Sequence, residues 1–206
     1  MNKTYPITVE NGRNETYRYR RKLRRFGLFY AGDDAYSGAI PEKRISAIKS
    51  FCKTKRLAFR IDNEYGRRSS DYRKVFFQTH KPLIGGIYLC AYCGRPLTRK
   101  RLTVDHIYPV GRSKESLKAQ KRLKKQGYSG INDPKNLVAA CETCNKRKGK
   151  NTGTWIIRGK IGQHQKLWII RWILRLLLIA FIVYIIYSNI RISEAYAWLK
   201  NALQSF

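Results

Sequence analysis

Residues 90–148 contain four short motifs in this order: Cys90-Ala-Tyr-Cys93, Val104-Asp-His-Ile-Tyr-Pro109, Asn136-Leu137 and Cys141-Glu-Thr-Cys144-Asn-Lys-Arg-Lys148. The first and last motifs each carry a Cys-x-x-Cys pair, and two thiolates at this spacing converge on one side of a tetrahedral metal ion. Together the pairs predict one structural zinc site with the ligands Cys90, Cys93, Cys141 and Cys144. Closing that site would gather the enclosed polar residues into one small unit.

The polar residues between the cysteine pairs are Asp105, His106 and Asn136, and Asn145 follows the last cysteine. In this order, the motifs resemble the HNH endonuclease family in its zinc-supported form. The resemblance implies an α+β fold built on a ββα-metal unit, in which a β-hairpin and a helix hold one catalytic divalent ion. It implies that Asp105 and Asn145 bind that ion and that His106 is the general base. It also implies that Asn136 fixes the catalytic loop and orients the His106 ring.

The chain departs from the family name at Asn145, where a second histidine would stand. Asparagine also occurs there within the family, so the departure leaves the implied activity intact. It leaves the catalytic metal open between Mg²⁺, Mn²⁺ and another divalent ion.

These residue types suit phosphodiester hydrolysis, which needs an activated water and stabilisation of negative charge. A neutral imidazole near pH 7 can accept a proton from water, and a hard cation held by carboxylate and amide oxygens can stabilise the phosphate and the leaving oxygen. Adjacent residues on a regular strand point to opposite faces, so we expect Asp105 and His106 at a strand end or bulge. The alternative is a zinc-clamped fold without catalysis, in which His106 is a hydrogen-bonded core residue.

The charge balance indicates a polyanionic partner. The chain has 43 Lys and Arg residues against 13 Asp and Glu residues, a formal net charge of +30. Such a surface binds nucleic acid by releasing its counterions, whereas a merely solvated surface normally carries charges of both signs. We expect DNA as the partner, with RNA as an open alternative. The predicted contact residues are Arg112, Lys121, Arg122, Lys124, Lys125, Lys146, Arg147 and Lys148.

Residues 1–80 are predicted to form a basic, mainly helical region that binds nucleic acid. Positions 1–10 lack the apolar core of a signal peptide. Positions 13–25 interleave basic and aromatic residues, a pattern shared by phosphate-binding arms and solvated basic helices. Turn-forming residues predict a loop at 27–38.

The elements expected after this loop are a helix from Pro41, a strand at 57–61 and a helix at 67–80. The first of these helices would bury Ile45, Ile48 and Cys52. Because the other cysteines form two metal-binding pairs, Cys52 is expected to remain a buried free thiol in a reducing compartment.

Residues 81–160 are expected to form the nuclease domain. The predicted hairpin strands lie at 102–106 and 136–140, and a helix from Cys144 carries Asn145.

A basic insert at 111–135 separates the two hairpin strands. Within it we predict a helix that begins after the N-cap Ser113 and ends at Gly127. The apolar residues Leu117 and Leu123 give it little surface to bury, so the insert is expected to order only on nucleic acid or to stay disordered.

Residues 161–206 form a C-terminal segment with a helix predicted at 172–190. Positions 176–190 carry no charge, about 22 Å of helix, and extension to Trp172 approaches the roughly 30 Å hydrocarbon core of a bilayer. The segment is apolar all round, unlike an interfacial helix, and aromatic residues flank it at both ends. We expect a single membrane span; the alternative is a buried or dimerising helix of a soluble protein.

Basic residues also predict the orientation of this span. Lys160, Lys166, Arg171 and Arg175 precede it, whereas Arg191 and Lys200 follow it. The positive-inside rule then places the preceding domain on the cytoplasmic face. The sequence therefore predicts a metal-dependent DNA endonuclease tethered to the cytoplasmic face of a membrane. The alternatives are a soluble cytoplasmic nuclease, a non-catalytic zinc-stabilised DNA-binding module, and a ribonuclease of the same fold.

Overall fold

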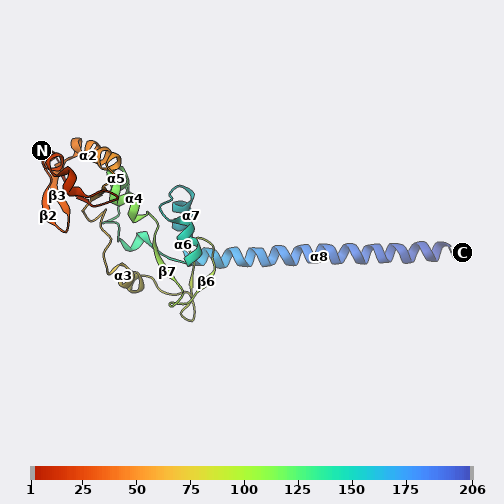
Figure 1. Cartoon of the computed structure of the whole chain (residues 1–206). Helices are drawn as coiled ribbons and strands as arrows, with labels where there is room; N and C mark the ends of the chain where they lie inside the picture. The colour runs from red at the N-terminus through yellow and green to blue at the C-terminus, as the bar shows by residue number, and fades with distance from the viewer. Residues whose placement is uncertain (1–2, 205–206) are drawn as a thin grey trace. The chain divides into compact units, whose positions relative to one another are not determined.

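The computed structural model describes residues 3–204, with side-chain environments through Ser193. The chain divides into two compact units, Met1–Gln163 and His164–Phe206. The first unit mixes helices and strands, as the α+β prediction requires, and contains two separate hydrophobic cores. The second unit consists mainly of one continuous helix, α8 (Gln165–Gln204) (Figure 1).

A four-stranded antiparallel sheet forms the N-terminal part of the first unit. Its strands are β1 (Thr4–Glu10), β2 (Phe29–Gly32), β3 (Ala35–Pro41) and β4 (Ala58–Ile61), in the order β2-β3-β1-β4. β1 buries Tyr5, Ile7 and Val9 at alternate positions in the core shared with α2 (Glu42–Thr54). The prediction of a mainly helical region missed this sheet, although helices also lie within residues 1–80. A short alternating segment becomes a strand once neighbouring strands complete its pairing.

The segment 27–38, predicted as a loop, contains most of the β2–β3 hairpin. The turn-forming residues that suggested a loop lie at the tip of this hairpin. Asp33 and Asp34 have φ angles of +46° and +55°, and Gly32 pairs with Ala35 across them. A two-residue type I′ turn requires positive φ at both central positions, which aspartate tolerates. The turn-forming residues indicate the turn itself, but they do not indicate the two strands on either side of it.

The other N-terminal predictions agree better with the structure. Ile45, Ile48 and Cys52 are buried on α2, and Cys52 is a free thiol whose pKa is raised to about 11 by burial. β4 confirms the expected strand. The basic segment 13–25 contains η1 (Thr16–Tyr19) and α1 (Arg20–Arg25), and α3 (Tyr72–Thr79) begins later than predicted.

A second core surrounds a two-stranded hairpin and the helix that follows it. β7 (Thr103–His106) pairs antiparallel with β8 (Leu137–Ala140), and α6 (Glu142–Lys148) comes directly after. The predicted hairpin and helix are thus confirmed. Two short strands, β5 (Tyr88–Leu89) and β6 (Pro96–Leu97), flank the first cysteine pair.

Helix α7 (Thr154–Gly162) closes this core through close backbone packing. A Cβ atom at Gly162 would lie 1.8 Å from the carbonyl oxygen of Ala91, so only glycine allows this approach to the first cysteine loop. A Cβ at Gly159 would press on the side chains of Ile107 and Tyr92. These contacts hold α7 against the loop that follows β7.

The insert is folded against the rest of the first unit. It contains α4 (Val110–Glu115), α5 (Leu117–Lys125) and η2 (Pro134–Asn136). Leu123 is fully buried, and the buried Gln120 side chain bonds to the Ser113 carbonyl and to Asn63 at 2.9 Å each. The expectation of disorder is therefore wrong, because polar contacts to other segments add to the small apolar face.

The helical cap in the insert also differs from the prediction. Ser116, not Ser113, accepts the capping hydrogen bond, from the backbone N–H of Ala119. Gly127, with φ of +78°, follows the helix end as expected.

In the second unit, α8 confirms the predicted apolar helix and extends beyond 172–190 at both ends. Its segment Gln165–Ser193 is long and apolar enough to cross a membrane, and none of the apolar window within it is buried. At 1.5 Å per residue this segment is about 43 Å long, which matches a bilayer including its headgroup regions. Length and composition alone also fit a helix of a soluble protein that is covered by another apolar surface.

Candidate functional site

The four cysteines of the two pairs converge in one cluster. The Sγ atoms of Cys90, Cys93, Cys141 and Cys144 all lie within 4.8 Å of one another. Sulfur atoms bound to one tetrahedral zinc at about 2.3 Å have a comparable separation. The distance of 4.0 Å between the Cys93 and Cys141 Sγ atoms is far beyond a disulfide bond, and all four thiols are free. The cluster can therefore hold a metal ion such as zinc.

The backbone around the cluster is arranged for thiolate ligands. The N–H of Cys141 donates to Cys90 Sγ at 3.3 Å, and the N–H of Cys144 donates to Cys141 Sγ at 3.5 Å. Burial nevertheless raises the pKa of the Cys90 thiol to about 11. Four neighbouring thiolates would repel one another without a cation. The positive charge of a bound metal ion offsets this repulsion and so favours the deprotonated form of its ligands.

Asp105, His106 and Asn145 line one open pocket of about 370 Å³. Asp105 and His106 end strand β7, and Asn145 projects from α6. The remaining lining residues come mainly from α3 and its preceding loop, and from the turns after β7 and α6: Arg68, Tyr72, Arg73, Thr103, Val104, Pro109, Val110, Gly111, Gly149 and Lys150. The pocket therefore combines oxygen ligands, an imidazole and several cations.

Asp105 is held from the interior by two side chains. The Tyr92 hydroxyl donates to Asp105 Oδ2 at 2.5 Å, and Lys148 Nζ lies 3.0 Å from the same oxygen. Lys148 Nζ also donates to the His106 carbonyl at 2.7 Å. With Oδ2 engaged by both groups, the carboxylate has a defined orientation and its second oxygen remains available to a ligand.

Lys148 was predicted to contact nucleic acid, but the structure buries it. Its side chain is only 1% exposed, and burial lowers the pKa of its ammonium group while the Asp105 carboxylate opposes that shift. A buried lysine is tolerated when it is paired and hydrogen-bonded. Lys148 thus links α6 to the end of β7.

The His106 ring is buried and oriented by Asn132. Its Nε2 lies 3.2 Å from Asn132 Oδ1, while the Asn132 amide nitrogen donates to the Arg67 carbonyl at 2.9 Å. That second bond requires the oxygen of Asn132 to face the ring. Nε2 must then carry the proton in the neutral imidazole, which leaves Nδ1 as the basic nitrogen.

Aromatic and cationic groups cover the same imidazole. The Tyr72 ring lies 5.2 Å from the His106 ring, and the Arg68 guanidinium lies 3.9 Å from the centre of the Tyr72 ring. Burial lowers the pKa of His106 to about 4, and the positive charges of Arg68 and Lys148 also lower it. The hydrogen bond to Asn132 and the charge of Asp105 raise the pKa but do not offset the burial. The ring is therefore neutral at pH 7.

Asn136 is fully buried and ties the loop after β7 to the end of the insert. Its Oδ1 accepts from the N–H of Tyr108 at 2.8 Å, and its Nδ2 donates to the Ile131 carbonyl at 2.7 Å. Within residues 3–204 its side chain makes no hydrogen bond to the His106 ring. The loop-fixing geometry implied for Asn136 is thus present, but Asn132 makes the contact that orients the ring.

The other predicted nucleic-acid contacts remain on the surface. Two of them make ion pairs, Lys121 with Glu42 and Lys146 with Glu142. The predicted contacts that are exposed are Arg112, Lys121, Arg122, Lys124, Lys125, Lys146 and Arg147.

Sequence reasoning missed the contribution of the segment before the first cysteine pair. Arg68, Tyr72 and Arg73 reach the pocket from this segment. Its basic and aromatic composition was visible, but nothing in the local sequence connects it to β7. Tyr92, within the first Cys-x-x-Cys motif, was also missed because its partner Asp105 lies 13 positions away.

One stretch of 60 residues is 37% identical to the CRISPR-associated endonuclease Cas9 of Corynebacterium diphtheriae. The similarity covers 29% of this chain and 4% of that protein, so this chain resembles a small part of it. No protein-family model and no solved structure matches the chain.

The cysteine cluster makes a testable prediction about metal content. We expect the purified chain to contain one equivalent of zinc, and Cys141→Ser to lose it together with part of the fold, because metal binding and folding are coupled in such sites. Elemental analysis and circular dichroism measure both effects. Cys52→Ser is the matched control, since Cys52 lies outside the cluster. A metal-free but folded wild-type chain would refute the assignment.

The histidine environment makes a second prediction. The chain has three histidines, so the ring protons of His106 can be assigned by NMR with His106→Gln as reference. We expect its pKa to lie well below the ordinary value, near 4. Asn132→Asp should raise it, because a carboxylate beside Nε2 favours the imidazolium. A pKa near 6.5 in the wild-type chain, or no response to Asn132→Asp, would contradict the described contact.

Proposed function

We propose that the chain is a metal-dependent endonuclease of the HNH type that hydrolyses DNA phosphodiester bonds. The observation that carries the proposal is the convergence of Asp105, His106 and Asn145 on one open pocket lined by arginine and lysine. The local similarity to an endonuclease supports the same reaction class. The net charge of +30 supports a nucleic-acid substrate.

In this proposal Asp105 and Asn145 hold one divalent ion. Their donors are a carboxylate and an amide oxygen, hard ligands that suit Mg²⁺ or Mn²⁺ with water completing the shell. The Asn145 side chain makes no hydrogen bond to another residue within 3–204, so its oxygen is available. When bound, the ion would stabilise negative charge on the phosphate and on the leaving 3′ oxygen.

His106 acts as the general base. Its Nδ1 is the unprotonated nitrogen because Nε2–H is donated to Asn132. Burial keeps the ring neutral, so the base form is present throughout the neutral pH range. A weakly basic nitrogen takes a proton less readily than one with a pKa near 7, and substrate phosphate beside the ring would raise its pKa toward that range.

Cations on two sides of the pocket bind the substrate phosphate. Arg68 and Arg73 approach from the side of α3, and Lys150 from the turn after α6. The Arg68 guanidinium is held against Tyr72, so it can offer its paired N–H groups to phosphate oxygens with little loss of side-chain freedom.

The proposal assigns structural zinc to the four-cysteine cluster. Cys141 is the N-cap of α6, and the same helix carries Asn145 and Lys148. Holding Cys141 against Cys90 therefore positions both residues relative to β7. The zinc would have no direct part in the reaction.

Cleavage of supercoiled plasmid with and without Mg²⁺ or Mn²⁺ tests the reaction. His106→Ala should lower the cleavage rate by about 10² to 10⁴ while leaving DNA affinity nearly unchanged, because a general base acts on the chemical step. His164→Ala, an equivalent change at an exposed histidine, is the control. Retention of zinc by both variants shows that they are folded.

The result separates the competing functions. Metal-dependent cutting of DNA that is lost in His106→Ala supports the proposal. Tight binding without cutting would instead identify a zinc-stabilised binding module. Preferential cutting of RNA of the same sequence would identify a ribonuclease of this fold.

We further propose that α8 tethers the nuclease to the cytoplasmic face of a membrane. Its exposed apolar residues run continuously from Leu176 to Ile179 and from Phe181 to Tyr187, and each such side chain costs about 1.5–3 kcal/mol when left in water instead of buried. The excess of basic residues before the span agrees with this orientation. The alternative is a soluble nuclease whose α8 packs against another protein.

Extraction behaviour distinguishes the two. The full chain should sediment with membranes and resist high salt and carbonate, whereas electrostatic adhesion would be reversed by salt. Ile179→Lys combined with Val183→Lys should abolish integration, at roughly 3 kcal/mol for each charge near the span centre. Lys118→Ala combined with Lys124→Ala, which removes charge without touching α8, should leave integration intact. A full chain released by salt would rule out the tether.

A further inference from the structure

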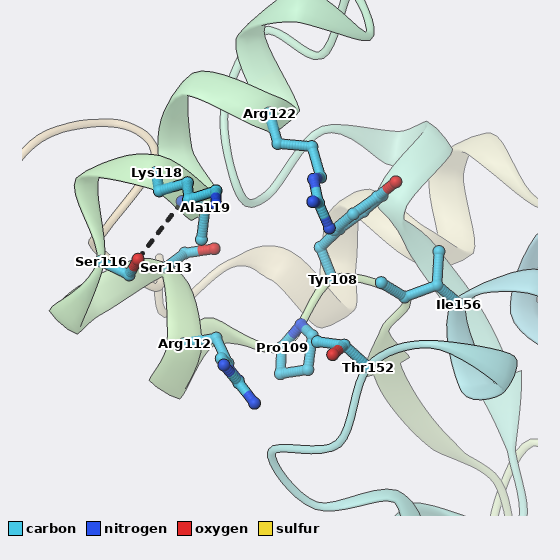
Figure 2. Close-up of a pocket in the computed structure, with 10 residues that line it drawn as sticks. All are labelled: Tyr108, Pro109, Arg112, Ser113, Ser116, Lys118, Ala119, Arg122, Thr152 and Ile156. Carbon is cyan, nitrogen blue, oxygen red and sulfur yellow. Dashed lines mark hydrogen bonds between the residues drawn. The ribbon is translucent and has the colours of Figure 1, made fainter.

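A second pocket lies between the insert and the segment around α7 (Figure 2). Its volume is about 250 Å³, and α4 and α5 of the insert form one side of it. Arg112 and Arg122 extend from these two helices to flank the hollow, with Thr152 and Ile156 on the opposite side (Figure 2). The lining residues are Tyr108, Pro109, Arg112, Ser113, Ser116, Lys118, Ala119, Arg122, Thr152 and Ile156.

The charge of this pocket is entirely positive. Arg112, Lys118 and Arg122 line it together with hydroxyl groups, and no lining residue is acidic. Within residues 3–204 none of these three cations makes an ion pair. Three unpaired cations around one hollow favour an anionic ligand with several acceptor oxygens, and arginine forks match a phosphate group.

The apolar wall is preformed. The Tyr108 hydroxyl donates to Gln126, and its ring packs edge-on against Tyr128 at 5.6 Å. Lys160 donates to the same Gln126 oxygen at 3.0 Å. Tyr108, Pro109 and Ile156 therefore present a fixed surface on which a sugar can rest beside a phosphate bound by the arginines.

The position of the pocket relates it to the candidate active site. Pro109 lines both pockets, Gly111 lines the catalytic one, and Arg112 lines the second. The two pockets therefore share a wall at Pro109, where the turn after β7 leads into α4. A polyanion whose scissile phosphate lies at Asp105 and His106 would bring another phosphate of the same strand over this turn.

We propose that this pocket binds a backbone phosphate of the substrate strand, close to the phosphate that is cleaved. The inference rests on the proposed nuclease function, which it deepens by giving the substrate at least two phosphate contacts on one strand. The insert is then a rigid part of the binding site that sets the path of the strand. A mobile basic tail would bind phosphates without fixing the spacing between the two contacts.

A length series of oligonucleotides tests the second phosphate site without relying on cleavage. The probes are single-stranded thymidine oligonucleotides of increasing length, and their Kd is measured for the full-length His106→Ala chain in detergent. Affinity should rise by about tenfold at the one length at which a linkage first reaches the pocket, as expected for a charge-assisted contact. Arg112→Ala combined with Arg122→Ala should remove this step.

Two controls make the test specific. Lys124→Ala combined with Lys125→Ala removes the same charge from the insert, but outside the pocket. This variant should bind probes of every length more weakly and should still show the tenfold rise in affinity at the same length. In the second control, an uncharged methylphosphonate replaces the phosphate at the linkage that produces the step. With Arg112 and Arg122 both present, this probe should no longer show the rise in affinity. It should have no further effect once Arg112 and Arg122 are replaced. Zinc content confirms that each variant is folded.

The outcomes decide between the possibilities. A smooth rise of affinity with length, or a step that survives loss of both arginines, would overturn the proposal. A step that survives the methylphosphonate would also overturn it, because the pocket would then recognise a base or sugar. A step with the predicted behaviour in a chain that never cleaves DNA would support the phosphate site and refute the nuclease function.

Discussion

The convergence of four cysteine sulfurs is the constraint on which the rest of the site depends. It joins the loop before β6 to the start of α6, two segments that are distant in sequence. The same junction places Tyr92 beside Asp105 and sets the helix that carries Asn145 and Lys148. A metal ion that bound these thiolates would therefore stabilise the positions of Asp105, Asn145 and Lys148 without contacting them, because the free energy of metal binding contributes to folding.

Lys148 is a buried residue that holds two residues of the open pocket, Asp105 and His106. A buried ammonium beside a carboxylate is costly unless both are hydrogen-bonded, and here Asp105 and the His106 carbonyl satisfy it. The pair fixes one carboxylate oxygen of Asp105, a residue that lines the open pocket. Its charge also offsets part of that of Asp105, which implies that metal affinity at the proposed site depends on water and substrate phosphate as additional ligands.

The first unit places two hollows on either side of one turn. The candidate catalytic pocket is lined mainly from α3 and the segment leading into it, from β7 and from α6, whereas the second is lined mainly from the insert and α7. The folded insert connects them, because its buried Gln120 and Leu123 hold α5 against the remainder of the unit. Both pockets thereby belong to the first unit, while α8 forms a separate unit with an exposed apolar surface.

The cysteine cluster could be predicted from the spacing of its metal ligands, and the apolar helix from its uninterrupted run of apolar residues. The β7–β8 hairpin and α6 were predicted from the resemblance of their motifs to a known family. The four-stranded sheet, the order in the insert and the buried state of Lys148 required the tertiary structure. Strand pairing and burial depend on which distant segments supply partners. For the same reason, two contacts could not be inferred from local sequence. The contact of Asn132 with His106 depends on how the insert folds against the hairpin, and the approach of Arg68 to the pocket depends on how the chain before Cys90 folds back onto it.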